Sequence, residues 1–223
     1  MTTNGGGRTT DVGPELPNLR PTSDLRHPTS AEPIGEIVET STTQFLAQAC
    51  ELGRAPAFGS LVKVLSGPAE VFGLVSRVRT GGLEPGAQAV MRGRAGVRDA
   101  AIYNENPDLE AVLRTEFTVL IVGFCEDGEL RQYLPPHPPA LHWSVHGCSE
   151  VDVATFSNRL DYFRTVLSAT DAPADELLAA NLRLVRKARP LDADFCLRAG
   201  RELARLLSRD YERLSQILRR IEP

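Results

Sequence analysis

The chain has 223 residues, a formal net charge of -4 at pH 7 and a hydrophobic content of 42%. This length suits one domain with an appendage or two small domains, and the apolar content is enough for a packed core. The negative net charge argues against a protein coated in nucleic acid, although it is compatible with a local basic patch.

The cysteines argue against several kinds of site. No pair shows C-x-x-C spacing, so neither a zinc ribbon nor a thioredoxin-type site is indicated. The first residues lack the apolar stretch of a signal peptide, and no run reaches the roughly 18 apolar residues of a membrane span. We therefore expect a cytoplasmic protein without a membrane span. The cysteines are Cys50, Cys125, Cys148 and Cys196.

The first 33 residues are rich in Gly, Thr, Pro and Asn and contain almost no large apolar side chains. Such a segment cannot bury enough surface to offset its ordering entropy, so we predict a disordered tail over residues 1–33. From Ile34 onward, apolar and polar residues alternate as in half-buried strands. We predict strands at residues 34–40, 44–52, 60–65 and 71–82. The second of these could also form a short helix, but its β-branched flanks favour a strand.

Two details refine this β region. Gly73 lies inside the fourth predicted strand and is typical of a β-bulge. Residues 84–116 interrupt the pattern and predict a loop followed by one or two short helices, with Asn106 as a helix cap. We therefore expect a barrel over residues 34–148 with a helical insertion at about 84–116.

The second half of the barrel begins with the most apolar run of the chain. Residues 117–124 are nearly all apolar and predict the most buried strand. Asp127-Gly128 follows and predicts a tight hairpin. The proline-rich segment 135–139 is then expected to close the β region as a stiff, extended stretch.

From Ser149 the apolar period becomes helical. Ser149 is a good N-cap, Pro173 opens a second helix, and Asp192 or Asp194 starts a third helix that reaches Ile221. We predict a helical region over residues 149–223. The fold class is therefore α+β: a small β-barrel with a helical insertion, followed by three helices.

The first strands share a characteristic set of residues: a glycine-bearing first strand, IGEIV, and the pair GSLVKV and VFGLVSRV. This pattern resembles the HAS-barrel family. The HAS-barrel is shared by the N-termini of HerA-type DNA translocases and the catalytic-head subunits of ATP synthases. AIYNENPDL, LRTEFTVLIVG and RQYLPPHPP further resemble stand-alone bacterial HAS-barrel proteins of unassigned function. Because the relatives' barrels pack into a ring, the resemblance implies an assembly surface.

The chain departs from the HerA-like ATPases at one decisive point. Those enzymes follow their barrel with a G-x-x-x-x-G-K-[ST] loop that holds the nucleotide phosphates. Neither Lys63 nor Lys187 follows a glycine-rich turn. We therefore expect no catalytic residues and no cofactor. The leading hypothesis is a non-enzymatic interaction module that docks onto itself or onto a ring-shaped ATPase. The alternative is an accessory nucleic-acid-binding factor for a HerA-like translocase.

The nucleic-acid alternative depends on arginines near the C-terminus. They recur every four residues and would form one ridge on a single helix, as phosphate contacts or as a protein-docking surface. Acidic residues are interleaved, so ion pairs on a solvated helix face are the competing interpretation. The ridge comprises Arg201, Arg205, Arg209 and Arg213. A glycine-rich loop with Arg92, Arg94 and Arg98 is a further candidate for anion binding, or simply an exposed loop.

A metal site is the third hypothesis. His142, His146 and Cys148 are all zinc ligands by type, and on one strand they would share a face. The alternative is a strand with partly buried imidazoles that bond to the backbone. We predict no metal site, because no separate His or Cys cluster completes the ligand set.

Overall fold

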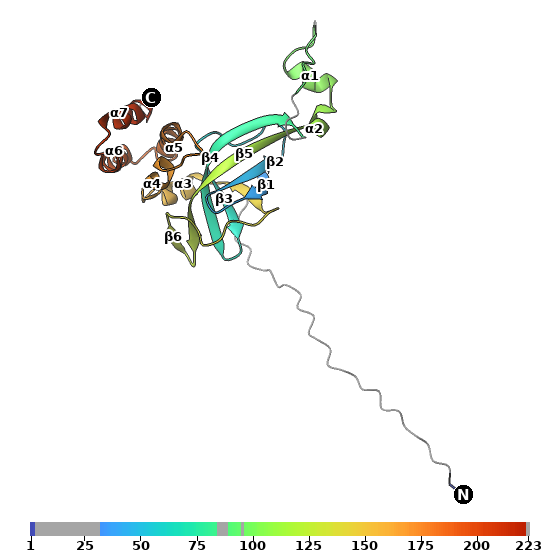
Figure 1. Ribbon diagram of the computed structural model, residues 1–223, viewed down its shortest axis with the longest axis horizontal. Coiled ribbons are helices and arrows are strands. Elements are labelled where there is room, and N and C mark those ends of the chain that lie inside the picture. Colours follow the sequence, from blue (N-terminus) through green and yellow to red (C-terminus); the bar gives the residue numbers. More distant parts are fainter. Residues whose placement is uncertain (3–31, 84–88, 95, 222–223) are drawn as a thin grey trace. The chain divides into compact units, whose positions relative to one another are not determined.

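A computed structural model describes residues 1–2, 32–83, 89–94 and 96–221 (Figure 1). The predicted tail, residues 1–33, lies almost entirely outside the described residues. Seven antiparallel strands form one sheet in the order β2-β1-β7-β3-β4-β5-β6. The strands are β1 (Gly35–Thr40), β2 (Gln44–Ala49), β3 (Leu61–Ser66), β4 (Ala69–Gly82), β5 (Leu113–Glu126), β6 (Glu129–Arg131) and β7 (Ser144–Gly147).

The sheet closes into a barrel because β2 also pairs with β5. Six strands form the barrel, and β6 extends from β5 as a hairpin outside the ring. Alternate side chains point into the barrel, as the period of two requires. The α+β fold class with a small barrel is thus confirmed. The barrel interior is filled mainly by Ile37, Phe45, Ala47, Val62, Val64, Val71, Val75, Phe117, Val119, Ile121, Phe124 and Val145.

Glycines shape the barrel where the sequence predicts irregular backbone. The register of β4 against β5 shifts between Phe72 and Gly73, which confirms the predicted bulge. A Cβ at Gly73 would lie 2.3 Å from Val119 Cγ1, so only glycine fits this close approach. Asp127 and Gly128 both have positive φ and form the predicted turn between β5 and β6.

The proline-rich segment does not close the β region, contrary to expectation. β7 follows it and pairs with both β1 and β3, so the barrel is completed by the last strand in the chain. Val145 is its buried residue and faces the barrel interior. The long connection from β6 therefore carries the chain across the barrel before β7 is inserted.

The described residues also form seven helices. Two short ones, α1 (Ala100–Glu105) and α2 (Leu109–Val112), lie between β4 and β5. Asp108, not Asn106, is the N-cap of α2, and Asn106 instead ends α1, with its side-chain amide donating to the Ile102 carbonyl. The remaining helices are α3 (Glu150–Phe156), α4 (Tyr162–Leu167), α5 (Ala174–Ala188), α6 (Phe195–Leu206) and α7 (Tyr211–Ile221).

Two of the three predicted C-terminal helices are divided. Ser149 caps α3 through a capping box with Asp152, as its position predicts. The helix ends at Phe156, where the N–H and the hydroxyl of Ser157 both donate to the Val153 carbonyl. The last helix breaks over residues 207–210, and α7 starts after this turn.

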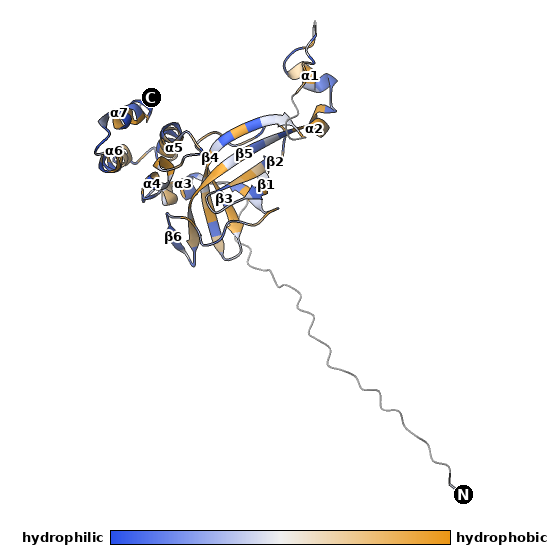
Figure 2. Ribbon diagram, in the orientation of Figure 1, coloured by the Kyte–Doolittle hydropathy of each residue, from blue (hydrophilic) through white to orange (hydrophobic). Residues whose placement is uncertain are grey.

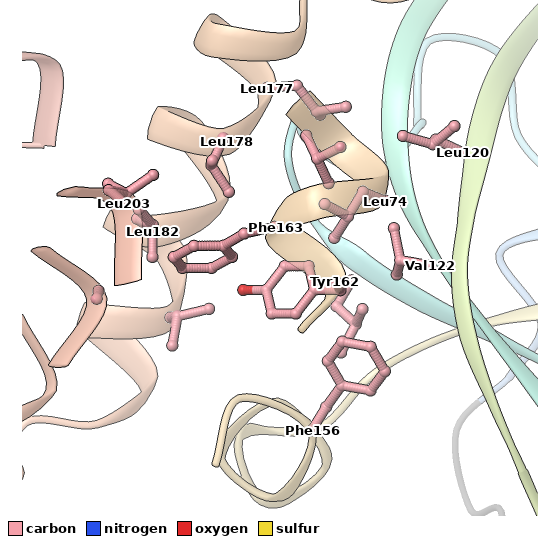
Figure 3. Close-up of a cluster of buried hydrophobic side chains, with 14 of the residues drawn as sticks. Leu74, Leu120, Val122, Phe156, Tyr162, Phe163, Leu177, Leu178, Leu182 and Leu203 are labelled. Carbon is pink, nitrogen blue, oxygen red and sulfur yellow. The ribbon is translucent and has the colours of Figure 1, made fainter. Parts of the chain in front are cut away.

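Helices α3 to α7 pack on the outer face of the barrel and share one core with it (Figure 3). Leu74, Leu120 and Val122 point from β4 and β5 toward aromatic side chains of α3 and α4. Figure 2 shows the middle of β5 as a hydrophobic stretch, since its side chains are buried on both faces. Leu203, Leu207 and Ile217 are buried in the same core, so the apolar stripe of the last two helices is largely used for internal packing.

Candidate functional site

The most exposed apolar segment of the described chain lies between the long strands β4 and β5. We call residues 77–115 the arm; residues 84–88 and 95 within it are not described. Figure 1 shows α1 and α2 at the ends of these two strands. Helix α1 has no buried residue, and Leu109 is the buried residue of α2. The described residues of the arm therefore form little hydrophobic core of their own.

Apolar side chains on the arm are unusually accessible. Val90 and Met91 are 81% and 90% exposed, and Tyr103 is 51% exposed. Leu83 and Val112 lie near the point where the strands end and are about half exposed. Single exposed apolar residues are normal, but a gathering of them on one element marks an interaction surface. The sequence did not predict this group of exposed apolar side chains.

Ion pairs, rather than apolar packing, hold the loop of the arm against its helices. Arg92 Nη1 lies 2.9 Å from Asp108 Oδ2, and Arg94 Nη2 lies 2.7 Å from Glu105 Oε2. Arg94 and Val97 also form a small β-bridge. Two of the three arginines of the glycine-rich loop are therefore engaged within the arm, which favours an exposed structural loop over an anion site.

A recess lies beside the base of the arm, on the outer face of β2, β4 and β5. Its volume is about 290 Å³, and its walls include Arg77, Arg79, Gln44, Leu46 and Glu39. Neither Arg77 nor Arg79 makes an ion pair or side-chain hydrogen bond with any described residue. Glu116, opposite Arg79 in the sheet, is engaged by Arg114, whose Nε lies 2.9 Å from Glu116 Oε1. The recess thus presents two cationic side chains to solvent.

The four C-terminal arginines do not form one ridge. Arg201 and Arg205 lie on α6, Arg209 lies in the turn after it, and Arg213 lies on α7. Residues spaced by four share one face only on a continuous helix. Because the helix breaks over residues 207–210, the four arginines do not line up on a single face.

Two of these arginines already have partners. Arg205 Nε lies 2.9 Å from Glu202 Oε2. Arg213 Nη2 lies 2.7 Å from Asp175 Oδ1, which ties α7 to α5. Arg201 and Arg209 are exposed and make no ion pair with the described residues. Two of the four arginines therefore form ion pairs within the protein, and an interaction role for all four stays a prediction.

The structure does not bring the candidate metal ligands His142, His146 and Cys148 together as one ligand set. His142 precedes β7, has a φ of 65°, and places its Nδ1 2.7 Å from Glu36 Oε1 on β1. His146 lies on β7 beside Lys63, and Cys148 packs against the core between barrel and helices. Burial raises the pKa of the Cys148 thiol, which disfavours the thiolate that a metal needs. Within the described residues, no group of three or more His, Cys, Asp or Glu side chains is placed to hold a metal.

Lys63 joins the barrel to the first helix of the helical region. Its Nζ lies 3.0 Å from Glu70 Oε1 and 3.2 Å from Asp152 Oδ1, and its side chain is only 12% exposed. Burial raises the pKa of Asp152, but hydrogen bonds from Ser149 and Lys63 outweigh it, so the pKa falls below its ordinary value. Burial likewise lowers the pKa of Lys63, but Glu70 and Asp152 outweigh it and raise the pKa. The arrangement is a structural ion-pair cluster.

Replacing this lysine is expected to weaken the junction between barrel and helices. Lys63→Met leaves two partly buried carboxylates without their cation and should lower the free energy of unfolding by about 1–3 kcal/mol at pH 7. Because folding lowers the pKa of Asp152, its carboxylate stabilises the folded protein at pH values above the ordinary pKa of 3.8. This contribution is lost as the pH falls through the lower pKa of the folded state. Because folding raises the pKa of Lys63, its ammonium group stabilises the folded protein at pH values below the ordinary pKa of 10.5. This contribution is lost as the pH rises through the higher pKa of the folded state.

Urea denaturation followed by circular dichroism checks both statements. The difference between wild type and Lys63→Met should be constant between these limits and shrink in acid. Lys187→Met is the matched control, since Lys187 is exposed on α5 and makes no ion pair with the described residues. An equal loss of stability in both variants would contradict the cluster's role.

A scan against protein-family models and a search of the curated proteins both found no match to this chain. The resemblance to the HAS-barrel therefore continues to rest on the residue pattern alone. None of the helices in the described residues is long and apolar enough to cross a membrane.

Proposed function

We propose that this chain is a cytoplasmic, non-enzymatic interaction module of the HAS-barrel kind, which joins a protein assembly through its arm. The observation that carries the proposal is the exposure of apolar side chains on the arm, above all Met91 and Tyr103. Burial of such side chains in a partner would release about 25 cal/mol per Å² of apolar surface. The ion pairs of Arg92 and Arg94 give the arm a defined shape before it meets the partner.

The partner is a protein rather than a nucleic acid in this proposal. Apolar and aromatic anchors are typical of protein interfaces, whereas nucleic-acid surfaces depend on unpaired cations. On the arm, Arg92 and Arg94 already pair with acids. Arg77 and Arg79, which are unpaired among the described residues, line a recess that also contains Glu39 and Glu116. The resemblance to the HAS-barrel implies that the partner is either a second copy of this chain or a ring-shaped ATPase.

Charged substitutions on the arm test the proposal. The double variant Met91→Asp, Tyr103→Asp is expected to reduce recovery of the partner from native extract by about tenfold or more, because each Asp would be desolvated in the interface. Both side chains are exposed in the isolated chain, so its melting temperature should not change. Affinity recovery with quantitative mass spectrometry measures the first effect, and circular dichroism measures the second.

The matched control is Leu191→Asp. Leu191 is 98% exposed, lies outside the arm in the turn before α6, and receives the same substitution. It should recover the partner as wild type does. The proposal is wrong if the control and the arm variant recover equal amounts. Light scattering on the purified chain tells a second copy from a different protein, because only self-association raises the mass of the isolated chain.

A further inference from the structure

One edge of β4 is left open at the base of the arm. β3 pairs with β4 only from Ala69 to Leu74, and the last bonds on this side join Val75 to Gly59 and Ser60. From Arg77 to Gly82, β4 pairs with β5 alone among the described residues. A strand with one unpaired edge presents a row of free N–H and C=O groups, which can bind another strand.

The register shows which backbone groups face the open side. Val75 donates its N–H to the Ser60 carbonyl at 3.0 Å and accepts from the Gly59 N–H at 2.8 Å, so it points away from β5. The register then shifts between Val75 and Arg77. Because orientation alternates along an antiparallel ladder, Arg77 and Arg79 bond to β5 after the shift. Val78 and Thr80 therefore present their N–H and C=O groups to the open edge.

The side chains along this edge are sorted by face and by charge. Arg77 and Arg79 share the outer face, are exposed, and border the recess of about 290 Å³ described above. Val78 lies on the opposite face and is 44% exposed. A strand added to this edge would place its residues directly opposite these side chains, with Cβ atoms about 5 Å apart. Acidic residues opposite the arginines and apolar residues opposite Val78 would complement both faces.

A second copy is a poor occupant of the same edge. A symmetric antiparallel pairing centred on Val78 sets Arg77 opposite Arg79, and one centred on Arg79 sets two copies of Arg79 face to face. A pairing centred on Thr80 avoids this clash, but it sets Arg79 opposite Gly81 and gives neither arginine an acidic partner. Like charges directly opposite each other destabilise a strand pair. The bulge and the two arginines also disfavour pairing with neutral strands, so they select for an acidic partner.

We propose that the open edge of β4, from Arg77 to Gly82, binds an extended segment of a partner protein as an added strand, with acidic side chains opposite Arg77 and Arg79. This inference rests on the proposed function, because it specifies how a partner that docks on the arm is recognised. Main-chain bonds at Val78 and Thr80 would supply affinity, and the arginines would set specificity.

A designed peptide tests the edge directly. The probe is a short, fluorescein-labelled peptide in which Glu alternates with Val, and the control peptide carries Lys in place of Glu. Fluorescence anisotropy with the full chain should show binding of the Glu peptide only, weakened by added salt. The variant Arg77→Glu, Arg79→Glu should reverse the preference and bind the Lys peptide. The proposal fails if wild type binds both peptides equally, binds neither, or keeps its preference after charge reversal.

A proline substitution tests the backbone contact. Thr80→Pro removes an N–H that faces the open edge and leaves the β4–β5 ladder intact, since proline is tolerated at such positions. It should weaken binding of the Glu peptide about fivefold or more. Thr80→Val is the matched control: it also removes the hydroxyl bond to Thr115 but keeps the N–H. Equal affinities of the two variants would overturn strand addition.

Two further results separate the possible failures. If Thr80→Pro does not fold, the charge-reversal pair still decides the proposal. The variant Met91→Asp, Tyr103→Asp lies outside the edge and should bind the Glu peptide like wild type. If that variant recovers as much partner from native extract as wild type does, and the Glu peptide still binds wild type, the proposed role of the apolar arm is wrong. The proposal that the edge of β4 binds an added strand then still stands. If the chain alone forms dimers that exclude the peptide, the edge binds a second copy and the proposal is wrong.

Discussion

Gly59→Ala is expected to lower the free energy of unfolding by about 3 kcal/mol or more, which is a large share of a typical domain's stability. Gly59 has a φ of +85°, and a Cβ there would lie 2.8 Å from both the Asn181 backbone nitrogen and Ala180 Cβ on α5. Its N–H also donates to the Val75 carbonyl. The substitution therefore pushes α5 away from the barrel at the point where the helix contacts the turn before β3.

Urea denaturation monitored by circular dichroism measures this loss, and Gly67→Ala is its control. Gly67 has a φ of +64° in the β3–β4 turn, but nothing lies within 4 Å of the added Cβ. This variant should lose only the backbone term, about 1 kcal/mol. A similar loss in both variants would show that backbone strain, not contact with α5, limits the junction.

Asn181→Ala is the second substitution with a large expected effect, about 3 kcal/mol. Asn181 is 2% exposed, accepts a hydrogen bond from the Tyr162 hydroxyl at 2.8 Å and donates one to the Gly59 carbonyl at 3.0 Å. Burial raises the pKa of Tyr162, so its hydroxyl stays protonated and remains a donor. Alanine leaves both buried partners unsatisfied and opens a cavity.

A double-mutant cycle with Tyr162→Phe isolates the side-chain bond. The two losses in free energy of unfolding should be less than additive, because Tyr162→Phe removes a donor that Asn181→Ala has already orphaned. Asn104→Ala, at an exposed position on α1, should change stability by less than about 0.5 kcal/mol. Strict additivity would mean that the two buried side chains act independently.

Local chemistry made several parts of the fold predictable. Gly73 indicates a bulge because no side chain fits between β4 and β5 there, and Asp127-Gly128 indicates a turn because both residues tolerate positive φ. Ser149 indicates a helix start because its hydroxyl can accept from the Asp152 N–H. Each of these features depends on a few neighbouring residues, so it can be recognised in the sequence without knowledge of the tertiary structure.

Long-range pairing was not predictable in the same way. β7 follows a proline-rich segment and has four residues, with Val145 as the buried one, so its periodicity is too short to stand out. Its place between β1 and β3 depends on closure of the barrel. The helical period continued through residues 207–210, where the apolar spacing alone does not show that the chain turns.

The candidate site shows the same limit. The composition of the arm does not reveal that Met91 and Tyr103 are exposed, because apolar residues are ordinarily assigned to a core. The open edge of β4 follows only from the point where β3 ends. In contrast, the arginine spacing was visible in the sequence but assumed one helix, and Arg213 instead pairs with Asp175 of another helix.

Hydrogen exchange on the partner assembly tests the central claim most directly. The backbone amides of the isolated chain and of the chain recovered with its partner would be compared peptide by peptide. We expect protection to increase within the arm, and most clearly over residues 77–82, where Val78 and Thr80 face the open edge. Protection confined to α6 and α7, with an unchanged arm, would contradict the proposal and move the interface to the C-terminal helices.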